Sequence, residues 1–288
     1  MSKKPVILGI ESSCDETAVA LLRENNLGEP EILSNIVSSQ VDIHKEFGGV
    51  VPELAARAHI EKIDLITKKA LDESGINLNE IDAVATTSGP GLIVCLSVGI
   101  NFGKAIAASL KKPFIAVNHL EGHALSPKLN SKINYPYLLL LISGGHSQFL
   151  CVEGLGKYKR LGTTIDDAAG EAFDKVSRML DAGYPGGPAI SKLASEAEAM
   201  NLQFPRAWLR DTYDFSFSGL KTAVLNYIKT KPNESANEIA WAFQDSVVDI
   251  LTRKTFAAAE DMNAQSIIIA GGVAANKNLR DRFLEKSK

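Results

Sequence analysis

Two segments of the sequence share one form, and this duplication restricts how the chain can fold. Residues 6–22 (VILGIESSCDETAVALL) and 137–153 (YLLLLISGGHSQFLCVE) each read as an apolar strand, a polar turn of small residues and a second apolar strand. A second pair, residues 83–96 (AVATTSGPGLIVCL) and 266–279 (SIIIAGGVAANKNL), each reads as an apolar strand, a Gly-rich turn and a helix start. Two similar halves predict two domains that face each other across a cleft.

The rest of the chain indicates an α/β fold. Apolar, β-branched segments alternate with stretches of helical periodicity at 52–75, 97–110, 168–180 and 236–262. The polar segment 127–136 (PKLNSKINYP) has the composition of a linker, so we place domains at 1–130 and 131–288. Residues 181–235 are rich in Gly, Pro and aromatic residues, which predicts an irregular insertion in the second domain.

Composition and charge exclude several classes of protein. With 45% apolar and 23% charged residues, the chain is not disordered, and we expect no stretch that approaches a membrane span. Three dispersed cysteines and an N-terminal apolar run interrupted by acidic residues predict a cytoplasmic protein without a signal peptide. Cys14, beside Asp15, could be a nucleophile, but a small buried residue is the favoured interpretation.

The net charge of −3 requires any nucleic-acid partner to meet a local basic patch or to be recruited by another protein. Residues 204–221 (FPRAWLRDTYDFSFSGLK) interleave Arg206, Arg210 and Lys221 with aromatic residues, a mixture that can stack a base and pair a phosphate backbone. A buried aromatic insertion is the alternative for this segment.

A pair of histidines is a candidate metal site. In VNHLEGHALS (117–126), His119 and His123 lie one helical turn apart, so on a helix both imidazoles share a face. The zincin signature H-E-x-x-H needs Glu directly after the first His, where this chain has Leu120. The pattern predicts a metal site without a protease mechanism.

Several Gly-rich turns are candidates for binding phosphate. Residues 142–148 (ISGGHSQ) join two strands, while 88–92 (SGPGL) and 270–279 (AGGVAANKNL) each follow a strand and open a helix, where amide groups favour an anion. None matches the P-loop or the Rossmann motif. In 165–180 (IDDAAGEAFDKVSRML), Asp166 and Asp167 are expected to cap the helix, and Asp174 is either a ligand contact or part of a solvated face.

Eight motifs, in order, resemble one family. GIESSCDETAVAL, GGVVPELAARAH, NHLEGH, LISGGHSQ, IDDAAGEAFDKVSRML, YPGGP, FSFSGLKTAV and AGGVAANKNLR are similar to the motifs of the universal tRNA threonylcarbamoyladenosine-modifying transferases, once labelled O-sialoglycoprotein endopeptidases. The resemblance implies the duplicated fold of the actin, sugar-kinase and heat-shock-chaperone ATPases, with two RNase H-like domains. It also implies transfer of a threonylcarbamoyl group from threonylcarbamoyl-AMP to the exocyclic amine of the adenosine 3′ of the anticodon (position 37), in tRNAs that read codons beginning with A.

The resemblance also assigns residues. His119 and His123 would hold iron or zinc, and the adenylate site would be lined by Leu141, Ile142, Ser143, Gly144, Gly145, Asp174, Gly187 and Asn276. Glu11 and Asp15 are candidates to orient the acceptor amine, with polar loop residues as the equal alternative. His146 is expected to make a structural hydrogen bond, and His44 and His59 are expected at the surface.

The resemblance implies partners as well as one departure. Family complexes combine a paralogous dimerisation subunit and a small ATPase with tRNA; a homodimer, and ATP, ADP or AMP in the same cleft, are further alternatives. Family chains continue past AGGVAANKNLR to a motif containing DNAAM, whose Asp is another metal ligand, and these 288 residues do not contain it. We therefore expect a C-terminally truncated second domain and weak metal binding. An ATPase or sugar kinase of the same fold and a non-catalytic scaffold are the competing functions.

Overall fold

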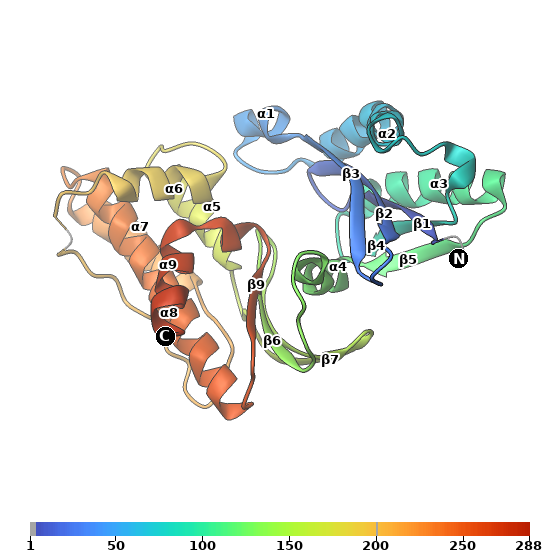
Figure 1. Cartoon of the computed structure of the whole chain (residues 1–288). Coiled ribbons are helices and arrows are strands. Elements are labelled where there is room, and N and C mark those ends of the chain that lie inside the picture. The colour runs from blue at the N-terminus through green and yellow to red at the C-terminus, as the bar shows by residue number, and fades with distance from the viewer. Residues whose placement is uncertain (1–3, 200) are drawn as a thin grey trace. The chain divides into compact units, whose positions relative to one another are not determined.

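The computed structural model describes residues 4–199 and 201–288. The chain forms two compact units, Met1–Ser131 and Lys132–Lys288, and each is built around one β-sheet that helices cover (Figure 1). Strands and helices alternate along both units, which confirms the predicted α/β class. The two units are described separately below.

The first unit contains a five-stranded sheet of order β3-β2-β1-β4-β5. Its strands are β1 (Val6–Glu11), β2 (Glu16–Glu24), β3 (Pro30–Ser39), β4 (Ala83–Gly89) and β5 (Phe114–Asn118). Strand β1 pairs antiparallel with β2 and parallel with β4. Alternate residues of β1 and β2, among them Leu8 and Val19, are fully buried, so one face of the sheet builds the core.

Two long helices cover the buried face of this sheet, and two short helices follow its strands β3 and β5. Helices α2 (Pro52–Ser74) and α3 (Ile93–Leu110) pack side by side on the sheet, and the short helices α1 (Val41–His44) and α4 (His119–Leu125) follow β3 and β5. Helix α3 has a mean hydropathy of 1.7 over 18 residues, so by length and composition it could span a membrane. The expectation that no stretch approaches a membrane span was therefore wrong. The helix packs on the sheet through Cys95, Gly99 and Ala107, and 28% of its 18 residues are buried.

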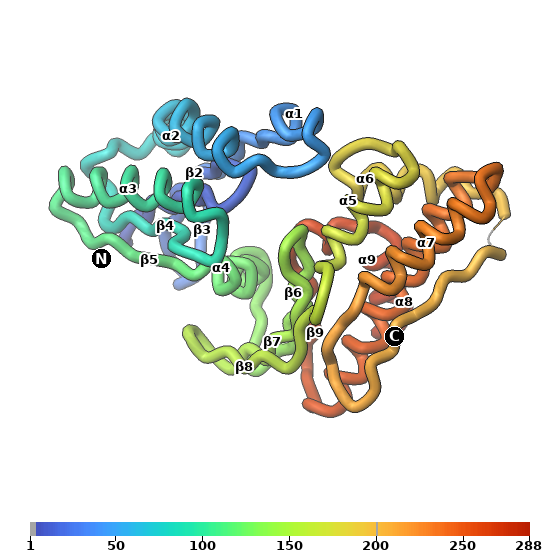
Figure 2. The backbone as a smooth tube through the Cα atoms, turned by 180° about the vertical axis from the view of Figure 1, so that it is seen from behind, coloured from blue at the N-terminus to red at the C-terminus, as the bar shows by residue number. Residues whose placement is uncertain are grey.

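The second unit contains a four-stranded sheet of order β8-β7-β6-β9. Its strands are β6 (Tyr137–Ile142), β7 (Ser147–Gly154), β8 (Lys157–Thr163) and β9 (Ile267–Ala270), and Figure 2 follows them from behind. Strand β6 is buried along its whole length, as its continuous apolar run predicts. Its helices are α5 (Ala169–Met179), α6 (Gly186–Ser195), α7 (Ser218–Thr230), α8 (Ala236–Asp261) and α9 (Lys277–Lys286).

The two sheets confirm the internal duplication. Strand β6 pairs antiparallel with β7 and parallel with β9, as β1 pairs with β2 and β4. The sheets differ at one edge, because β4 has β5 on its outer side whereas β9 has no such strand among residues 4–199 and 201–288. A groove of about 770 Å³ lies there, lined in part by Phe256, Ile267, Ile269, Phe283 and Leu284. An open edge of this kind can accept a further strand.

The region predicted to be irregular is only partly so. Residues 181–235 contain helices α6 and α7, and the described residues outside these helices form no strand, apart from the bridge of Phe215 to Thr164. Buried Phe204, Phe215 and Phe217 anchor the segment between the helices in the core of the second unit. The aromatic residues of the segment therefore serve mainly as core.

Candidate functional site

The turn after β1 brings several polar groups together in the first unit. The Glu11 carboxylate accepts a hydrogen bond from the Ser13 amide (2.5 Å) and another from the Thr87 hydroxyl at the end of β4. The same carboxylate lies 3.3 Å from Nδ1 of His119, and the Ser13 hydroxyl lies 3.3 Å from that nitrogen. Parallel pairing of β1 with β4 places the carboxyl ends of both strands beside the start of α4.

The two candidate metal ligands lie on one short helix. Helix α4 begins at His119, and the Asn118 side chain caps it by accepting hydrogen bonds from the amides of Leu120 and Glu121. The imidazoles of His119 and His123 have centroids 4.6 Å apart in an edge-on arrangement. The structure therefore brings the two rings together, as their spacing predicts.

The electrostatics of Glu11 favour a fixed carboxylate. Burial alone would raise the pKa of Glu11, but the hydrogen bonds from His119, Ser13 and Thr87 outweigh it and lower the pKa to about 2. An ionised carboxylate can accept a proton from Nδ1 of His119, and in that tautomer the Nε2 lone pair is available to a ligand. Metal-binding histidines in proteins are commonly oriented by such a carboxylate.

These residues fit a metal ion in part. Two imidazoles and an orienting carboxylate match the chemistry of a zinc or iron site, which needs further ligands from elsewhere. The described part of the chain contains no cluster of three or more His, Cys, Asp or Glu residues with the arrangement of a metal site.

Asp15 and Cys14 have a different environment from Glu11. Cys14 is exposed rather than buried, which corrects the favoured interpretation of this residue. Partial desolvation by the surrounding protein and the neighbouring Asp15 carboxylate raise the pKa of the Cys14 thiol to about 12. A thiol that holds its proton so firmly is a poor nucleophile. Asp15 thus lies beside the thiol on the turn that carries Ser13.

His44 and His59 are both fully buried, so their expected surface position was wrong. The hydroxyl of Thr17 lies 2.7 Å from Nδ1 of His59, and the amide of Val51 donates to Nδ1 of His44. Burial of an imidazole is tolerated when its nitrogens have hydrogen-bond partners, and both rings have them.

The Gly-rich turn of residues 143–146 is the candidate anion site of the second unit. It joins β6 to β7, closed by a hydrogen bond from the Ser143 amide to the His146 carbonyl (2.7 Å). Gly144 and Gly145 are exposed, and a Cβ on either would meet no atom within 4 Å. The side of each glycine on which a Cβ would stand is therefore open to a ligand. Leu141 and Ile142 are fully buried, so only their main chain could line a site.

The remaining predicted adenylate residues lie on α5, α6 and α9. The Asp174 carboxylate accepts a hydrogen bond from the Gly186 amide (2.7 Å), and Gly187 beside it has open space where a Cβ would stand. The Asn276 side chain caps α9 by accepting from the Leu279 amide (3.0 Å) and donates to Ser191 and Gln244. Asp174 and Asn276 thus both hold structure together at the positions where a ligand contact is predicted.

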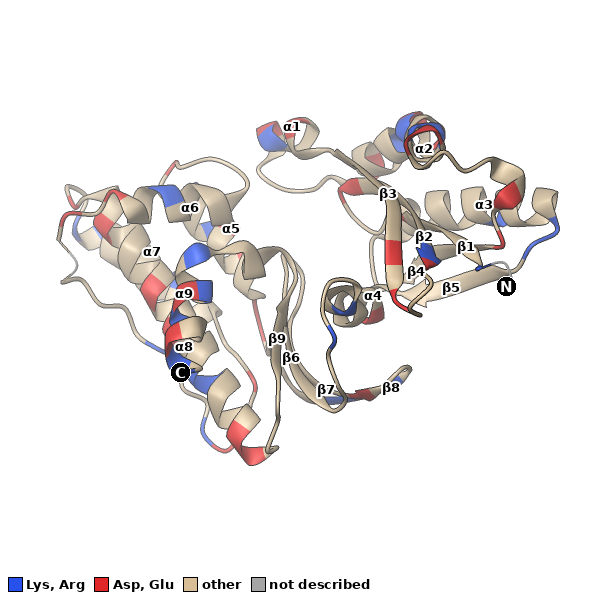
Figure 3. Ribbon diagram, in the orientation of Figure 1, with Lys and Arg blue, Asp and Glu red and all other residues tan. Residues whose placement is uncertain are grey.

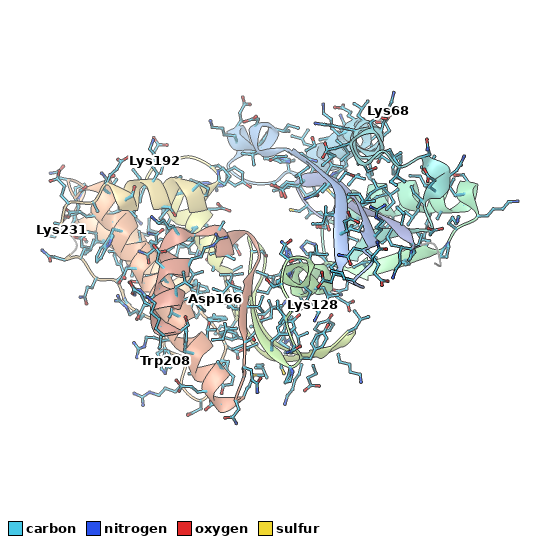
Figure 4. All side chains as sticks on the ribbon, in the orientation of Figure 1. Lys68, Lys128, Asp166, Lys192, Trp208 and Lys231 are labelled. Carbon is cyan, nitrogen blue, oxygen red and sulfur yellow. The ribbon has the colours of Figure 1, made fainter. Side chains whose placement is uncertain are left out.

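The acidic pair before α5 binds the start of α7, and Asp167 also pairs with a lysine of α5. Asp166, labelled in Figure 4, accepts hydrogen bonds from the hydroxyls of Ser216 and Ser218 and from the amides that open α7. Asp167 forms ion pairs with Lys175 (2.7 Å) and Lys221 (2.6 Å). The prediction that they cap α5 was wrong, because the sequence does not show that α7 begins beside them.

The predicted RNA-binding residues of this segment are largely engaged with protein. Arg206 pairs with Asp245 and Asp249 of α8, where Figure 3 shows acidic and basic residues gathered. Trp208 is 45% exposed, with the Arg253 guanidinium 5.0 Å from its ring centroid. Of the aromatic residues in this segment, Trp208 is the exposed one that a base could reach.

Sequence reasoning missed several residues that build these sites. Ser13 and Thr87 hold Glu11, although neither type is distinctive in sequence. Gly271 has φ +93°, and a Cβ on it would lie 2.3 Å from the Ile142 carbonyl oxygen. A Cβ on Gly170 would lie 2.7 Å from the Ser143 oxygen. Close main-chain approach at the end of β6 therefore requires both glycines.

Comparison with known proteins places the chain in a family. The family described as tRNA N6-adenosine threonylcarbamoyltransferase matches residues 31–288. The chain belongs to this family. It is 60% identical to the enzyme of that name from Pelagibacter ubique (strain HTCC1062), over 98% of this chain and 81% of the relative. It is 49% identical to that of Thermosipho africanus (strain TCF52B), over 98% of this chain and 86% of the relative.

Solved structures support the fold. The crystal structure of T. kodakarensis HypF resembles 98% of this chain with a TM-score of 0.65 at 12% identity, over 43% of that chain. A full-length HypF in phosphate- and nucleotide-bound form resembles 99% of this chain with a TM-score of 0.64 at 14% identity, over 51% of that chain. The predicted duplicated actin-like ATPase fold is thereby confirmed.

Proposed function

We propose that this chain transfers the threonylcarbamoyl group from threonylcarbamoyl-AMP to the exocyclic amine of adenosine 37 in tRNAs that read codons beginning with A, with release of AMP. Membership of the transferase family supports the reaction class. The observation that carries the proposal is the Glu11–His119–His123 constellation, because a sugar kinase or ATPase does not need a histidine pair for phosphoryl transfer.

The candidate residues of the two units have different roles in this reaction. In the first unit, His119 and His123 would hold the metal ion, and Glu11 fixes the His119 ring by accepting its Nδ1 proton. A bound iron or zinc ion would act as a Lewis acid on the carbamoyl carbonyl or as an anchor for the threonyl part. Glu11 is thereby a positioning residue, whereas Asp15 remains the candidate to orient the acceptor amine.

In the second unit, the turn of Gly144 and Gly145 and the start of α6 at Gly187 would hold the phosphate of the adenylate, because nothing lies where a Cβ of these glycines would stand. Asp174 and Asn276 would shape the rest of that site by fixing the starts of α6 and α9. Threonylcarbamoyl-AMP is a mixed anhydride and already activated, so orientation and stabilisation of leaving AMP suffice without a covalent nucleophile. The protonated Cys14 thiol agrees with such a mechanism.

Partners complete the proposal. We expect tRNA capture to involve a paralogous dimerisation subunit and a small ATPase, because the net charge of −3 gives the chain little attraction for RNA of its own. Ile93 and Val94 at the start of α3 are exposed and support a protein contact on the first unit. We place the domains at 1–130 and 131–288 and the activity in the cytoplasm.

The test is a transfer assay with purified protein, threonylcarbamoyl-AMP, unmodified tRNA, a divalent metal and the partner subunits. Mass spectrometry of the digested tRNA should detect the modified nucleoside. His119→Ala should abolish it, whereas Glu121→Ala, on the same helix between the histidines, should retain it. Absence of product, combined with ATP hydrolysis by the chain alone that survives His119→Ala, would overturn the proposal in favour of an ATPase.

A further inference from the structure

The first unit also contains a buried polar network around His44 and His59. His59 of α2 lies in the motif GGVVPELAARAH, and its Nε2 is 3.0 Å from the carbonyl oxygen of Cys14. A carbonyl oxygen can only accept, so Nε2 must carry the proton and Nδ1 must be the acceptor. The Thr17 hydroxyl (2.7 Å) and the Gln40 side-chain nitrogen (3.3 Å) donate to that Nδ1.

The network extends through Gln40 to His44. The Gln40 side-chain nitrogen also lies 3.4 Å from the Ala55 carbonyl, so its oxygen faces His44 Nε2 at 3.3 Å. Nδ1 of His44 accepts from the Val51 amide (3.3 Å), which makes Nε2 the donor to Gln40. Each ring nitrogen of both histidines therefore has a partner of matching character. A fully satisfied network of this kind is rigid and specifies one arrangement.

The network ends on the turn that serves the candidate metal site. Three consecutive carbonyls of this turn each accept a hydrogen bond from a different segment: Ser13 from the Leu92 amide (2.8 Å), Cys14 from His59 and Asp15 from the Gln40 amide (3.1 Å). Only the middle carbonyl is held by a side chain. The amide of Ser13, on the same turn, donates to the Glu11 carboxylate that meets His119.

We propose that His59 is a positioning residue for His119. By holding the Cys14 carbonyl, it fixes the turn whose Ser13 amide presents the Glu11 carboxylate to Nδ1 of His119. The ring of His119 is then kept in the Nδ1-protonated tautomer, with Nε2 directed to a ligand. This inference rests on the proposed function, in which His119 is a metal ligand.

The test reads the tautomer of His119 directly. The full chain, labelled with [¹⁵N]histidine and kept metal-free at mildly alkaline pH, is examined by long-range ¹H–¹⁵N correlation NMR, and the five histidines are assigned by single substitutions. In the wild-type chain, His119 should show the Nδ1–H pattern, and His44 and His59 should show the Nε2–H pattern. A wild-type His119 with the Nε2–H pattern overturns the proposal without any variant.

Two substitutions of His59 separate its two hydrogen bonds. His59→Asn keeps a polar group near Thr17 but cannot reach the Cys14 carbonyl, so the His119 signal should move toward a mixture of tautomers. His59→Gln places an amide nitrogen near the former Nε2 and should restore the wild-type pattern. The signal of His146, in the second unit, should stay unchanged in both variants.

Thr17→Val is the matched control, because it removes a bond to the same ring and leaves the Cys14 bond in place. Its His119 signal should match that of the wild type. A folded His59→Asn chain with the wild-type His119 pattern contradicts the proposal, as does a failure of His59→Gln to restore that pattern. These signals are read from the metal-free chain and do not depend on transfer activity. A chain that lacks transfer activity would therefore refute the proposed function but leave the proposed role of His59 intact.

Discussion

Replacement of Gly271 by alanine should destabilise the second unit strongly, whereas the same change at Gly272 should not. Gly271 ends β9 with φ +93° and ψ 168°, a region that is essentially restricted to glycine. A Cβ there would lie 2.3 Å from the oxygen and 2.7 Å from the carbon of the Ile142 carbonyl. Those atoms belong to the central strand β6 and cannot swing aside. A Cβ on Gly272 would meet nothing within 4 Å.

The magnitude follows from three contributions. The backbone conformation costs a non-glycine residue about 1–2 kcal/mol, and the overlap with β6 adds about 1–3 kcal/mol. Alanine also reduces the conformational entropy of the unfolded chain, which stabilises the folded state by about 0.4–1 kcal/mol. We therefore expect Gly271→Ala to lower the free energy of unfolding by about 3 kcal/mol, and Gly272→Ala to leave it unchanged or slightly raised.

Tryptophan fluorescence is a suitable assay, because both tryptophans, Trp208 and Trp241, belong to the second unit. With a urea dependence of about 2 kcal/mol per molar, a loss of about 3 kcal/mol lowers the midpoint by about 1.5 M. Equal midpoints for Gly271→Ala and Gly272→Ala would refute the reasoning, because they would mean that β6 and β9 can separate at little cost.

Three further outcomes follow from the contacts. Asp166→Asn should cost about 1 kcal/mol after solvent screening, because the hydroxyl of Ser218 and its neighbours lose a charged acceptor. Burial raises the pKa of Asp166, but these hydrogen bonds outweigh burial and lower the pKa. The stabilisation is therefore present above the ordinary pKa of Asp and disappears as the pH falls. Denaturation curves of the wild-type chain and Asp166→Asn should converge in acid. Alkylation of Cys14 at pH 8 should be at least about 10-fold slower in the folded chain than in urea, since its pKa is about 12; equal rates would contradict the protonated thiol. Arg206→Gln should lower the free energy of unfolding by about 1–3 kcal/mol, because it removes the ion pair with Asp245, and should leave the affinity for tRNA unchanged. Weaker tRNA binding with intact stability would show that Arg206 contacts RNA rather than holding the fold.

The sequence predicts the central elements well and the edges poorly. Strands β1, β6 and β9 contain short apolar runs, and β6 is buried along its whole length between its neighbours β7 and β9. Strand β8 (KYKRLGT) carries three charged residues and buries only Gly162, so it has little hydrophobic signal and forms because β7 offers a partner. Helix α7 is hidden for a similar reason, since its start is fixed by Asp166, which lies 52 residues earlier in the chain.

The candidate site shows the same limit at the level of single residues. The spacing of His119 and His123 is enough to predict that their rings meet, because one helical turn determines it. The burial of His59 depends on a hydrogen bond with Thr17, 42 residues away in sequence, and on another with the Cys14 carbonyl. Every residue has a backbone carbonyl, so the sequence gives no signal for the second bond. Local pattern therefore predicts the candidate ligands of the site, while the groups that orient them come from tertiary contacts.

The Gly-rich turns show why residue type alone cannot separate packing from binding. SGPGL and ISGGHSQ read alike as phosphate-binding turns, yet a Cβ on Gly91 would lie 2.7 Å from the Ser13 carbonyl oxygen, whereas Gly144 and Gly145 have open space. The amide of Leu92 is also taken, since it donates to the same Ser13 carbonyl. The first turn therefore uses its glycine to hold the strand end that carries Glu11, whereas in the second turn nothing lies where a Cβ of Gly144 or Gly145 would stand. Alanine at Gly91 should accordingly disturb the histidine site, and alanine at Gly144 should leave the fold unchanged and affect only the proposed adenylate binding.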